Sequence, residues 1–177
     1  MQKSGKILYV ERLQTPIGIL LLTHDGAELC NAEFEHQEAR RAQELAHHFP
    51  GARLVDQSKR SEFAKALTAY FKGEIRAIDK VPVAKLGTPF QQTAWTSLRQ
   101  IPAGSTRSYG DQAAKLGKPN AARAVGRANG LNPVSIVVPC HRLIGADGSL
   151  VHYGGGIRRK RWLIEHEASN TRSKTAK

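Results

Sequence analysis

The first 35 residues carry apolar side chains in short aliphatic runs that are typical of β-strands. The segments ILYVERL (residues 7–13) and IGILLLTHDG (residues 17–26) are rich in β-branched and aliphatic residues. Turn-forming residues separate these runs, at Pro16-Ile17-Gly18 and again at Asp25-Gly26. The pattern therefore predicts strands joined by tight turns at the start of the chain.

Helical spacing replaces this pattern in the next part of the chain. Residues 35–49 place apolar side chains three or four positions apart, and Pro50-Gly51 closes the segment. After a polar loop to Arg60, a second helix begins at Ser61 and ends at Gly73. Its apolar face consists of Phe63, Leu67, Tyr70 and Phe71. We therefore predict a compact α/β domain over residues 1–80, without a pattern typical of catalysis.

The composition changes at residue 81. The segment VPVAKLGTP contains two prolines and a glycine, so we predict a linker over residues 81–88. Thr88 then provides a helix N-cap, and Pro89 takes the first helical position. The helix that follows ends at Pro102-Ala103-Gly104, and its apolar side chains should lie in the core: Phe90, Ala94, Trp95, Leu98 and Ile101.

Two short helices come next, and their arrangement is typical of a helix-turn-helix. Ser108 caps a helix that ends at Gly117, and Lys118-Pro119-Asn120 opens another that ends at Gly130. A turn at residues 145–148, followed by a strand at residues 150–153, predicts the wing of a winged helix-turn-helix domain.

A last helix, IRRKRWLIEHEA, completes this predicted domain over residues 89–168. Its side chains Trp162, Leu163 and His166 should point inward. The remaining residues 169–177 are polar and basic, so we predict a flexible, solvated tail.

The second of the two short helices consists almost wholly of small residues, with arginines among them. Arg123 and Arg127 lie one turn apart and so share one face of this helix. A smooth helix face can pack closely against another helix, or it can enter a groove of nucleic acid. The charge of the chain favours the second interpretation.

The net charge of +12 is concentrated in one half of the chain. Lys and Arg outnumber Asp and Glu by 14 to 4 after residue 87, but only by 13 to 11 before it. Each neutralised phosphate of a nucleic acid releases counterions, so an excess of this kind indicates a polyanionic partner. A basic protein that is kept soluble by its charge remains the alternative.

Several classes of protein are disfavoured by what the sequence lacks. No apolar run reaches the ~18 residues of a membrane span, and no signal peptide core is present, so we expect the cytoplasm. The two cysteines, Cys30 and Cys140, are not expected to pair in that compartment. Neither has a second cysteine within a few residues, and the histidines are scattered, so we expect no metal and no cofactor.

The stretch SIVVPCHR holds the candidate for covalent chemistry. Val137-Val138-Pro139 should form a strand with a rigid end, followed at once by Cys140, His141 and Arg142. A neighbouring cation or proton acceptor turns a thiol into a nucleophile. Adjacent side chains of a strand point to opposite faces, so direct pairing of Cys140 with His141 needs a turn or a bridging water. A buried cysteine beside a structural histidine is the alternative.

Acidic residues are rare in this half, and the last helix holds two of them, Glu165 and Glu167. A carboxylate behind a histidine orients the ring and stabilises its charged form. A Cys-His-Glu relay is therefore a hypothesis that the residue types alone support.

Residues 88–168 resemble the O6-alkylguanine-DNA alkyltransferase family, the methylated-DNA–protein-cysteine methyltransferases. The resemblance is carried by PFQQTAWTSLRQIPAG, SYGDQAAKLGKPNAARAVGRANGLNPVSIVVPCHR, GSLVHYGGG and KRWLIEHE. The first 87 residues resemble the bacterial Ogt-type subgroup in length and α/β pattern. The resemblance implies a ribonuclease H-like N-terminal domain followed by an α-helical winged helix-turn-helix domain.

The activity that this resemblance implies is direct-reversal DNA repair in a single turnover. The alkyl group of O6-alkylguanine, and also of O4-alkylthymine, would pass irreversibly to a cysteine after the base is flipped out of the duplex. The partner would be double-stranded DNA bound through its minor groove, with no membrane and no metal. We expect a monomer, and cooperativity on DNA stays open.

The same resemblance assigns catalytic roles to matching residues. Cys140 would accept the alkyl group, His141 would deprotonate it through a water, and Glu167 would hold His141. Tyr109 would contact a phosphate and protonate N3 of guanine, and Asn132 would hold the turn beside the active site.

Binding roles follow in the same way. Arg123 would enter the base stack from a minor-groove helix whose matching residues also include Ala121, Ala122 and Arg127. The carbonyls of Cys140 and Leu143 would accept the guanine amino group. Tyr153 would wall the alkyl pocket, and the Gly154 N–H would contact O6.

Two departures from the family pattern concern the pocket. Some relatives have serine where Gly154 stands, but the contact there is made by the backbone N–H, which glycine retains. Many relatives have glycine before the tyrosine, whereas His152 stands here and bears on the size of the pocket.

Three rival functions are weaker. A non-catalytic alkylation-damage binding protein would lack the cysteine, so Cys140 argues against it. A winged-helix transcription regulator would carry varied base-reading side chains on its second helix rather than alanines. A thiol hydrolase would need an oxyanion site, and none is recognisable in the sequence.

Overall fold

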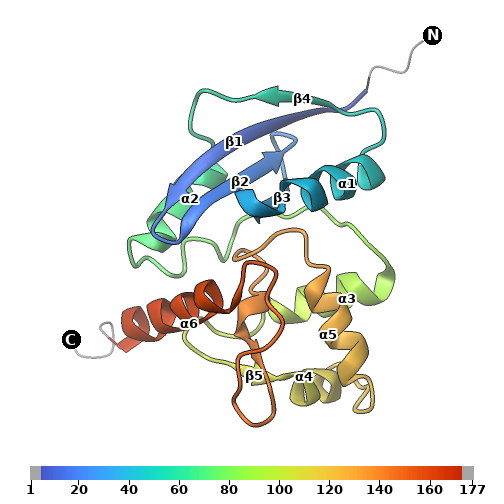
Figure 1. The fold of residues 1–177 in the computed structure, drawn as a ribbon, viewed down its shortest axis with the longest axis vertical. Helices are drawn as coiled ribbons and strands as arrows, with labels where there is room; N and C mark the ends of the chain where they lie inside the picture. Colours follow the sequence, from blue (N-terminus) through green and yellow to red (C-terminus); the bar gives the residue numbers. More distant parts are fainter. Residues whose placement is uncertain (1–4, 173–177) are drawn as a thin grey trace.

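The computed structural model describes residues 5–172, which form two stacked domains (Figure 1). The N-terminal domain is a sheet with two helices, and the C-terminal domain is mainly helical. Buried side chains of both domains belong to one hydrophobic cluster, among them Leu22, Phe34 and Tyr70 with Leu98, Val138 and Leu163. Packing therefore joins the two domains in addition to the linker.

The N-terminal sheet has four strands in the order β3-β2-β1-β4. The antiparallel strands are β1 (Ile7–Thr15), β2 (Gly18–His24) and β3 (Leu29–Phe34). The apolar runs predicted β1 and β2, and β3 lies within the first 35 residues, where strands were expected. Strand β4 (Arg53–Asp56) pairs in parallel with β1, although this segment was expected to be a polar loop. That prediction was wrong because β4 is a largely exposed edge strand, so no apolar alternation marks it.

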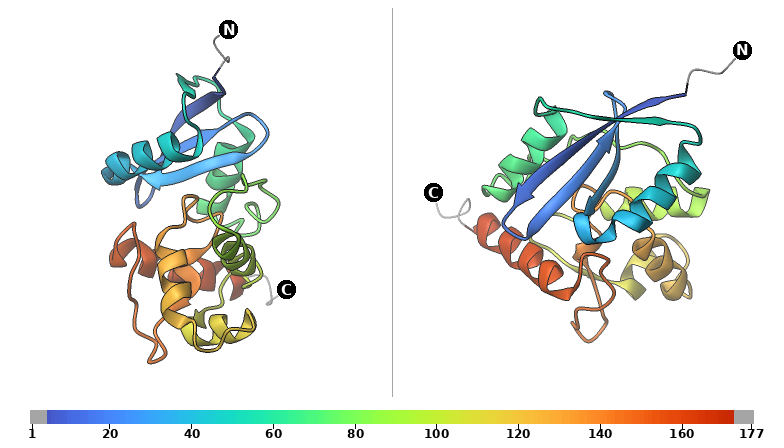
Figure 2. Two further views of the ribbon diagram at one scale, coloured as in Figure 1. Left: turned by 90° about the vertical axis from the view of Figure 1, so that its right-hand side faces the viewer. Right: turned by 45° about the horizontal axis from the view of Figure 1, so that its top comes forward.

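The two helices of this domain cover opposite faces of the sheet (Figure 2). From α1 (Glu38–His48), which follows the short 3-10 helix η1 (Glu35–Gln37), Arg41 donates to Thr23 Oγ1 at 3.1 Å. From α2 (Glu62–Phe71), the Phe63 ring lies 4.8 Å from that of His24. Neighbouring strand residues point to opposite faces, so the contacts to Thr23 and His24 place α1 and α2 on different sides.

The C-terminal domain has four helices and a small parallel sheet. Its elements are α3 (Pro89–Leu98), β5 (Arg107–Ser108), α4 (Tyr109–Lys115), α5 (Ala122–Gly130), β6 (Leu143–Ile144) and α6 (Ile157–Arg172). Helix α3 begins with a capping box, in which Thr88 Oγ1 accepts from Gln91 N and Gln91 Oε1 accepts from Thr88 N. Ser108 caps α4 through Asp111 N, so both predicted helix starts are confirmed.

Two boundary predictions for this domain were wrong. The predicted turn exists, with Gly145 N donating to Ser149 O at 2.8 Å, but residues 150–153 form no strand, and β6 pairs with β5 instead. Helix α6 continues to Arg172, although a tail was expected from residue 169. Within this last turn the side chains of Asn170 and Thr171 donate to the carbonyls of His166 and Glu167. Residues 173–177 of the expected tail lie outside the described residues.

The outer edge of strand β3 is covered by two segments from later in the chain. Leu29 N donates to Pro82 O at 2.9 Å, and Ala84 N donates to Leu29 O at 3.0 Å. Further along, Ala32 N donates to Pro133 O and Ser135 N donates to Ala32 O, both at 2.9 Å. The linker and the segment before Cys140 thus satisfy backbone groups that an open sheet edge would expose.

Candidate active site

Cys140 follows a tight turn rather than the expected strand. Ile136 is fully buried and has a positive φ of 74°, and the tight turn around it is closed by Val138 N, which donates to Val134 O at 3.0 Å. Residues Cys140–Arg142 then form the 3-10 helix η2. The strand prediction was wrong because an apolar run shows burial but does not reveal a left-handed residue within it. This turn leads directly into η2, whose first two residues are Cys140 and His141.

Asn132 braces this turn with its side-chain amide. Its Nδ2 donates to Val138 O at 2.8 Å, and its Oδ1 accepts from Val134 N at 3.0 Å. The amide also approaches the thiol of Cys140 and favours its ionised form. Asn132 therefore holds the turn that leads to Cys140.

His141 and Glu167 form a buried pair. Nε2 of His141 lies 2.9 Å from Glu167 Oε1, and both side chains are almost fully buried. Burial alone would raise the pKa of Glu167, but His141 and Arg142 outweigh it and hold that pKa well below its usual range. Since an ionised carboxylate only accepts hydrogen bonds, Nε2 carries the proton and Nδ1 is the acceptor.

The imidazole is therefore poised as a base. Burial lowers the pKa of His141, against the opposing influence of Glu167, so the ring is neutral before reaction. Its Nδ1 has no hydrogen-bond partner among the described residues. A neutral ring with a free acceptor can take a proton, and Glu167 would then stabilise the charged ring.

Glu167 accepts hydrogen bonds from several parts of the chain. Arg142 donates to it through Nε and Nη2, each at 2.9 Å. Gly104 N donates at 3.1 Å and Tyr70 Oη at 2.9 Å. Glu165, the other acid of this helix, is exposed, so Glu167 is the carboxylate that meets the histidine.

The thiol of Cys140 is free and only 5% of the residue is exposed. Burial raises the pKa of Cys140, while Asn132 and Lys160 oppose that shift. The resting thiol is therefore protonated, and its activation requires a base nearby.

Sequence reasoning missed Lys160, a fully buried lysine of α6. Its Nζ donates to Val151 O at 2.7 Å and lies 5.8 Å from the centre of the Tyr109 ring. Burial lowers the pKa of Lys160 to about 8, and the Cys140 thiolate opposes the shift. Helical spacing was the available signal, because Lys160 shares a face with Leu163 and Glu167.

Of the predicted pocket residues, Tyr153 has a pKa that is raised by burial, and it lies close enough to Cys140 for a thiolate there to raise it further. Tyr153 and Leu143 are buried, whereas Gly154 is exposed and its carbonyl accepts from Gln37 Nε2 at 2.5 Å. Tyr109 is half-buried, and its hydroxyl lies 3.4 Å from Val151 O. Burial raises the pKa of Tyr109, which therefore keeps its proton near neutral pH.

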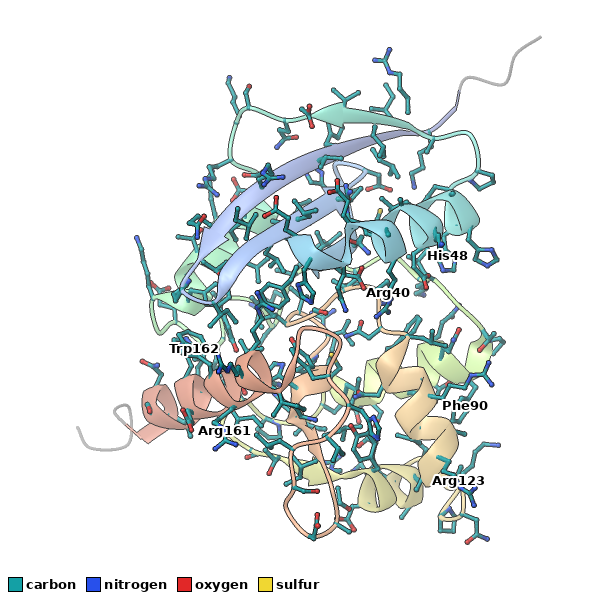
Figure 3. The ribbon with its side chains drawn as sticks, in the orientation of Figure 1. Arg40, His48, Phe90, Arg123, Arg161 and Trp162 are labelled. Carbon is teal, nitrogen blue, oxygen red and sulfur yellow. The ribbon has the colours of Figure 1, made fainter. Side chains whose placement is uncertain are left out.

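Helix α5 connects the thiol to the candidate nucleic-acid surface. At its C-terminal end Asn129, which the sequence analysis missed, donates from Nδ2 to Cys140 O at 3.2 Å. At its N-terminal end Arg123 is exposed, and Figure 3 shows it at the outer side of the helix. Arg127 is exposed as well, while Ala121 and Ala122 pack partly against the core. The arginines are thus exposed together with Ala124, and Ala121 and Ala122 remain partly accessible beside them.

Two observations concern other kinds of site. Across residues 5–172, no three His, Cys, Asp or Glu side chains gather closely enough to hold a metal ion. Within the same range, every helix is too short or too polar to cross a membrane.

The structure thus combines two exposed arginines on α5 with a thiol, that of Cys140, which directly precedes the histidine of a buried histidine–carboxylate pair. Two family models match such a chain: the 6-O-methylguanine DNA methyltransferase ribonuclease-like domain over residues 8–84, and the DNA binding domain of the same family over residues 89–169. The chain belongs to the 6-O-methylguanine DNA methyltransferase family. The family resemblance inferred from the sequence is therefore confirmed, and so is its division into a ribonuclease-like and a DNA-binding domain.

Relatives and solved structures agree with this assignment. A methylated-DNA–protein-cysteine methyltransferase of Shigella flexneri is 43% identical over 163 residues, covering 90% of this chain and 95% of the relative. One of Mycobacterium bovis is 46% identical over 165 residues, covering 92% and 94%.

The structure of Mycobacterium tuberculosis O6-methylguanine methyltransferase has a TM-score of 0.77 and 42% identity, covering 92% of this chain and 94% of that one. The structure of the Mycobacterium tuberculosis OGT in complex with DNA has a TM-score of 0.75 and 41% identity, covering 93% and 94%.

Proposed function

We propose that this chain repairs DNA by direct reversal, passing the alkyl group of O6-alkylguanine irreversibly to the thiol of Cys140. O4-alkylthymine is the second substrate of the proposal. The observation that carries it is the buried His141–Glu167 pair directly after a free thiol, in a chain of this family. Activity in a single turnover follows from the chemistry, because a thioether is not hydrolysed under ordinary conditions.

The proposed step begins with removal of the thiol proton. His141 Nδ1 takes this proton through a bridging water, and Glu167 stabilises the resulting imidazolium. The thiolate then attacks the alkyl carbon in line. The sulfur–carbon bond forms as the carbon–O6 bond breaks, and the electron pair of that bond passes to the base. Tyr109 donates its hydroxyl proton to N3 of the departing guanine, and the proton held by His141 passes through water to the tyrosinate, so that both side chains end neutral.

Access to the thiol explains why the base must leave the duplex. Cys140 is 5% exposed, so a base within the stack cannot reach it. Flipping a base costs a few kcal/mol, which contacts with the protein must offset. In our proposal Tyr153 walls the alkyl pocket, the Gly154 N–H contacts O6, and the carbonyls of Cys140 and Leu143 accept the guanine amino group.

The DNA lies along α5 in this proposal, as in a winged helix-turn-helix whose second helix occupies the minor groove. The minor groove is only about 6 Å wide, which suits the small side chains of Ala121 and Ala122. Arg123 then enters the space left by the flipped base, and Arg127 lies one turn further along the groove. A monomer is sufficient for this arrangement.

The first test is mass spectrometry of the intact protein and its peptides after mixing with a duplex that contains one O6-methylguanine. We expect a gain of one methyl group per chain, mapped to Cys140. Tight binding of the lesion without any mass change would instead indicate the alternative function, a non-catalytic alkylation-damage binding protein.

A second test concerns the role of Arg123. Arg123→Ala should slow transfer from duplex DNA by about tenfold, the typical effect of one lost contact of this kind. Transfer from free O6-benzylguanine, which needs no base flipping, should be unchanged. Arg76→Ala is the matched control, because Arg76 is an exposed arginine of the N-terminal domain. Equal slowing on both substrates would refute the role of Arg123 in the duplex.

A further inference from the structure

Tyr70 brings the N-terminal domain into contact with the candidate catalytic relay. It lies on α2 and is fully buried. Its hydroxyl donates to Glu167 Oε1 at 2.9 Å, across the seam between the two domains and 97 residues away in sequence. His141 Nε2 lies at the same distance from the same oxygen. Tyr70 and the relay histidine therefore share one acceptor atom.

We propose that Tyr70 is a positioning residue of the alkyl-transfer reaction, which acts through Glu167 to set the proton affinity of His141. The proposal rests on the proposed function of Cys140 and His141. It assigns the N-terminal domain a direct part in activating the thiol, through one hydroxyl group.

The hydrogen bonds around Glu167 show how this influence arises. Oε1 accepts from Tyr70, His141 and Arg142, and Oε2 accepts from Arg142 and Gly104. A carboxylate has about four favourable acceptor directions, so five donors saturate it. Each donor on Oε1 draws negative charge toward itself. Less charge then remains to stabilise an imidazolium at His141.

Tyr70 is suited to act as a permanent donor. Burial and the nearby Glu167 raise the pKa of Tyr70 far above neutrality, so its hydroxyl keeps its proton. Contacts at the seam fix its position, since His166 Nε2 lies 2.7 Å from Tyr70 O and the two rings meet edge to face at 5.3 Å. Phe71 packs beside it against Trp162, which Figure 3 shows on α6 near α2.

Other charged or titratable groups also face the histidine and the carboxylate, from four parts of the chain. They are Arg142 on η2, Lys160 on α6, Tyr153 in the loop before α6, and Tyr70 on α2. The positive charges of Arg142 and Lys160 disfavour protonation of His141, whereas the negative charge of Glu167 favours it. Replacing Tyr70 by phenylalanine leaves all the others in place and removes one donor from Oε1.

The direction of the expected effect follows from this balance. Without the Tyr70 hydroxyl, Glu167 becomes a stronger acceptor for His141, and the pKa of His141 rises. A histidine that is protonated already cannot take the thiol proton. The acid limb of the pH–rate profile should therefore move to higher pH.

The experiment compares Tyr70→Phe with the wild type and with Phe71→Leu. Phe71→Leu is a matched control, because it trims the same seam without touching Glu167. Single-turnover transfer is measured against pH with free O6-benzylguanine and with the duplex. We expect the midpoint of the acid limb to rise by about half a unit in Tyr70→Phe, with rates about threefold lower below it. Phe71→Leu should leave the midpoint unchanged, even where thermal unfolding shows a loss of stability.

An NMR titration of the His141 ring in the same three proteins provides a readout that does not depend on transfer. The pKa of His141 should rise in Tyr70→Phe alone. Equal pKa values in wild type and Tyr70→Phe, or the same displacement in Phe71→Leu, would overturn the proposal. Absence of any transfer by the wild type would refute the proposed function instead, while the titration still decides the role of Tyr70.

Discussion

Both domains bury a cysteine and an almost inaccessible glutamate, but the surroundings of these groups differ. In the N-terminal domain Cys30 and Glu33 are each 1% exposed, and in the C-terminal domain Cys140 and Glu167 are 5% and 1% exposed. Cys30 packs against Leu8 and Leu45, and its thiol donates to Glu28 O at 3.6 Å. Burial raises its pKa to about 11. The charged side chains that act on Cys30 are those of Asp25, Lys6 and Glu28, and none of these three described residues is a histidine.

The two glutamates show the same contrast. Burial raises the pKa of Glu33 to about 7, and the ion pair with Arg40 at 3.4 Å offsets this only in part. Glu167 is as deeply buried, yet its donors hold its pKa far below the usual range. The comparison teaches that burial is common to both regions, and that the partners of the buried groups distinguish a reactive site from a structural one.

The largest effect should separate the two cysteines. Cys140→Ala should abolish alkyl transfer and leave DNA binding intact, because it removes only the acceptor atom. Cys30→Ala should transfer at the wild-type rate. Single-turnover assays, with lesion binding measured in parallel, check both variants. Methylation of Cys140→Ala would show that another residue accepts the alkyl group.

The second effect should separate the two glutamates. Glu167→Gln should slow transfer by about a hundredfold or more, since the histidine loses the charge that stabilises its protonated form. It should also lower the free energy of unfolding by about 3–5 kcal/mol, because Arg142 becomes a buried charge without its partner. Glu33→Gln should transfer normally at neutral pH, and serves as the matched control.

The pH dependence of this loss has a definite sign. The pKa of Glu167 is lower in the folded than in the unfolded state, so its stabilisation is complete above its unfolded pKa and is lost as the pH falls through the folded value. The free energies of unfolding of the wild type and Glu167→Gln, measured in urea, should therefore become equal in strongly acidic solution. A gap that is the same at every pH would contradict this assignment.

The smallest effect concerns Glu33, whose folded pKa of about 7 lies above its unfolded value. Its ionisation then disfavours the folded state as the pH rises, from the unfolded value of about 4.3 upward. The stability of Glu33→Gln relative to the wild type should therefore be about 2–3 kcal/mol more favourable at pH 8 than at pH 5. Urea unfolding at the two pH values measures this, and an equal difference at both would contradict it.

Local patterns predicted most of the elements, and the failures have physical causes. Ser61, Thr88 and Ser108 cap helices as predicted, because a capping side chain acts on its own backbone neighbours. Strand β4 was missed because pairing with β1, rather than burial, defines it. The turn at Ile136 was missed because its strain is supported by packing between distant segments.

The residues of the candidate site also fall into those that the sequence predicted and those that depend on packing between distant segments. Cys140, His141 and Glu167 were predicted from residue types and family resemblance, and the structure brings the last two together. Tyr70 could not be predicted, because its role depends on how one domain docks on the other. Lys160 stands in a run of basic residues, and only its helical spacing with Leu163 and Glu167 indicated the burial that the structure shows.

The covered edge of β3 bears on how far the two domains are independent modules. The family models divide the chain between residues 84 and 89, but Leu29 and Ala32 form hydrogen bonds with segments on either side of that division. A cut at the linker would leave the N-terminal fragment with an open strand edge, a surface that invites self-association. The complementary fragment would lose the support of the turn before its thiol. The two domains should therefore be kept together as one unit when the protein is truncated or fused to other proteins.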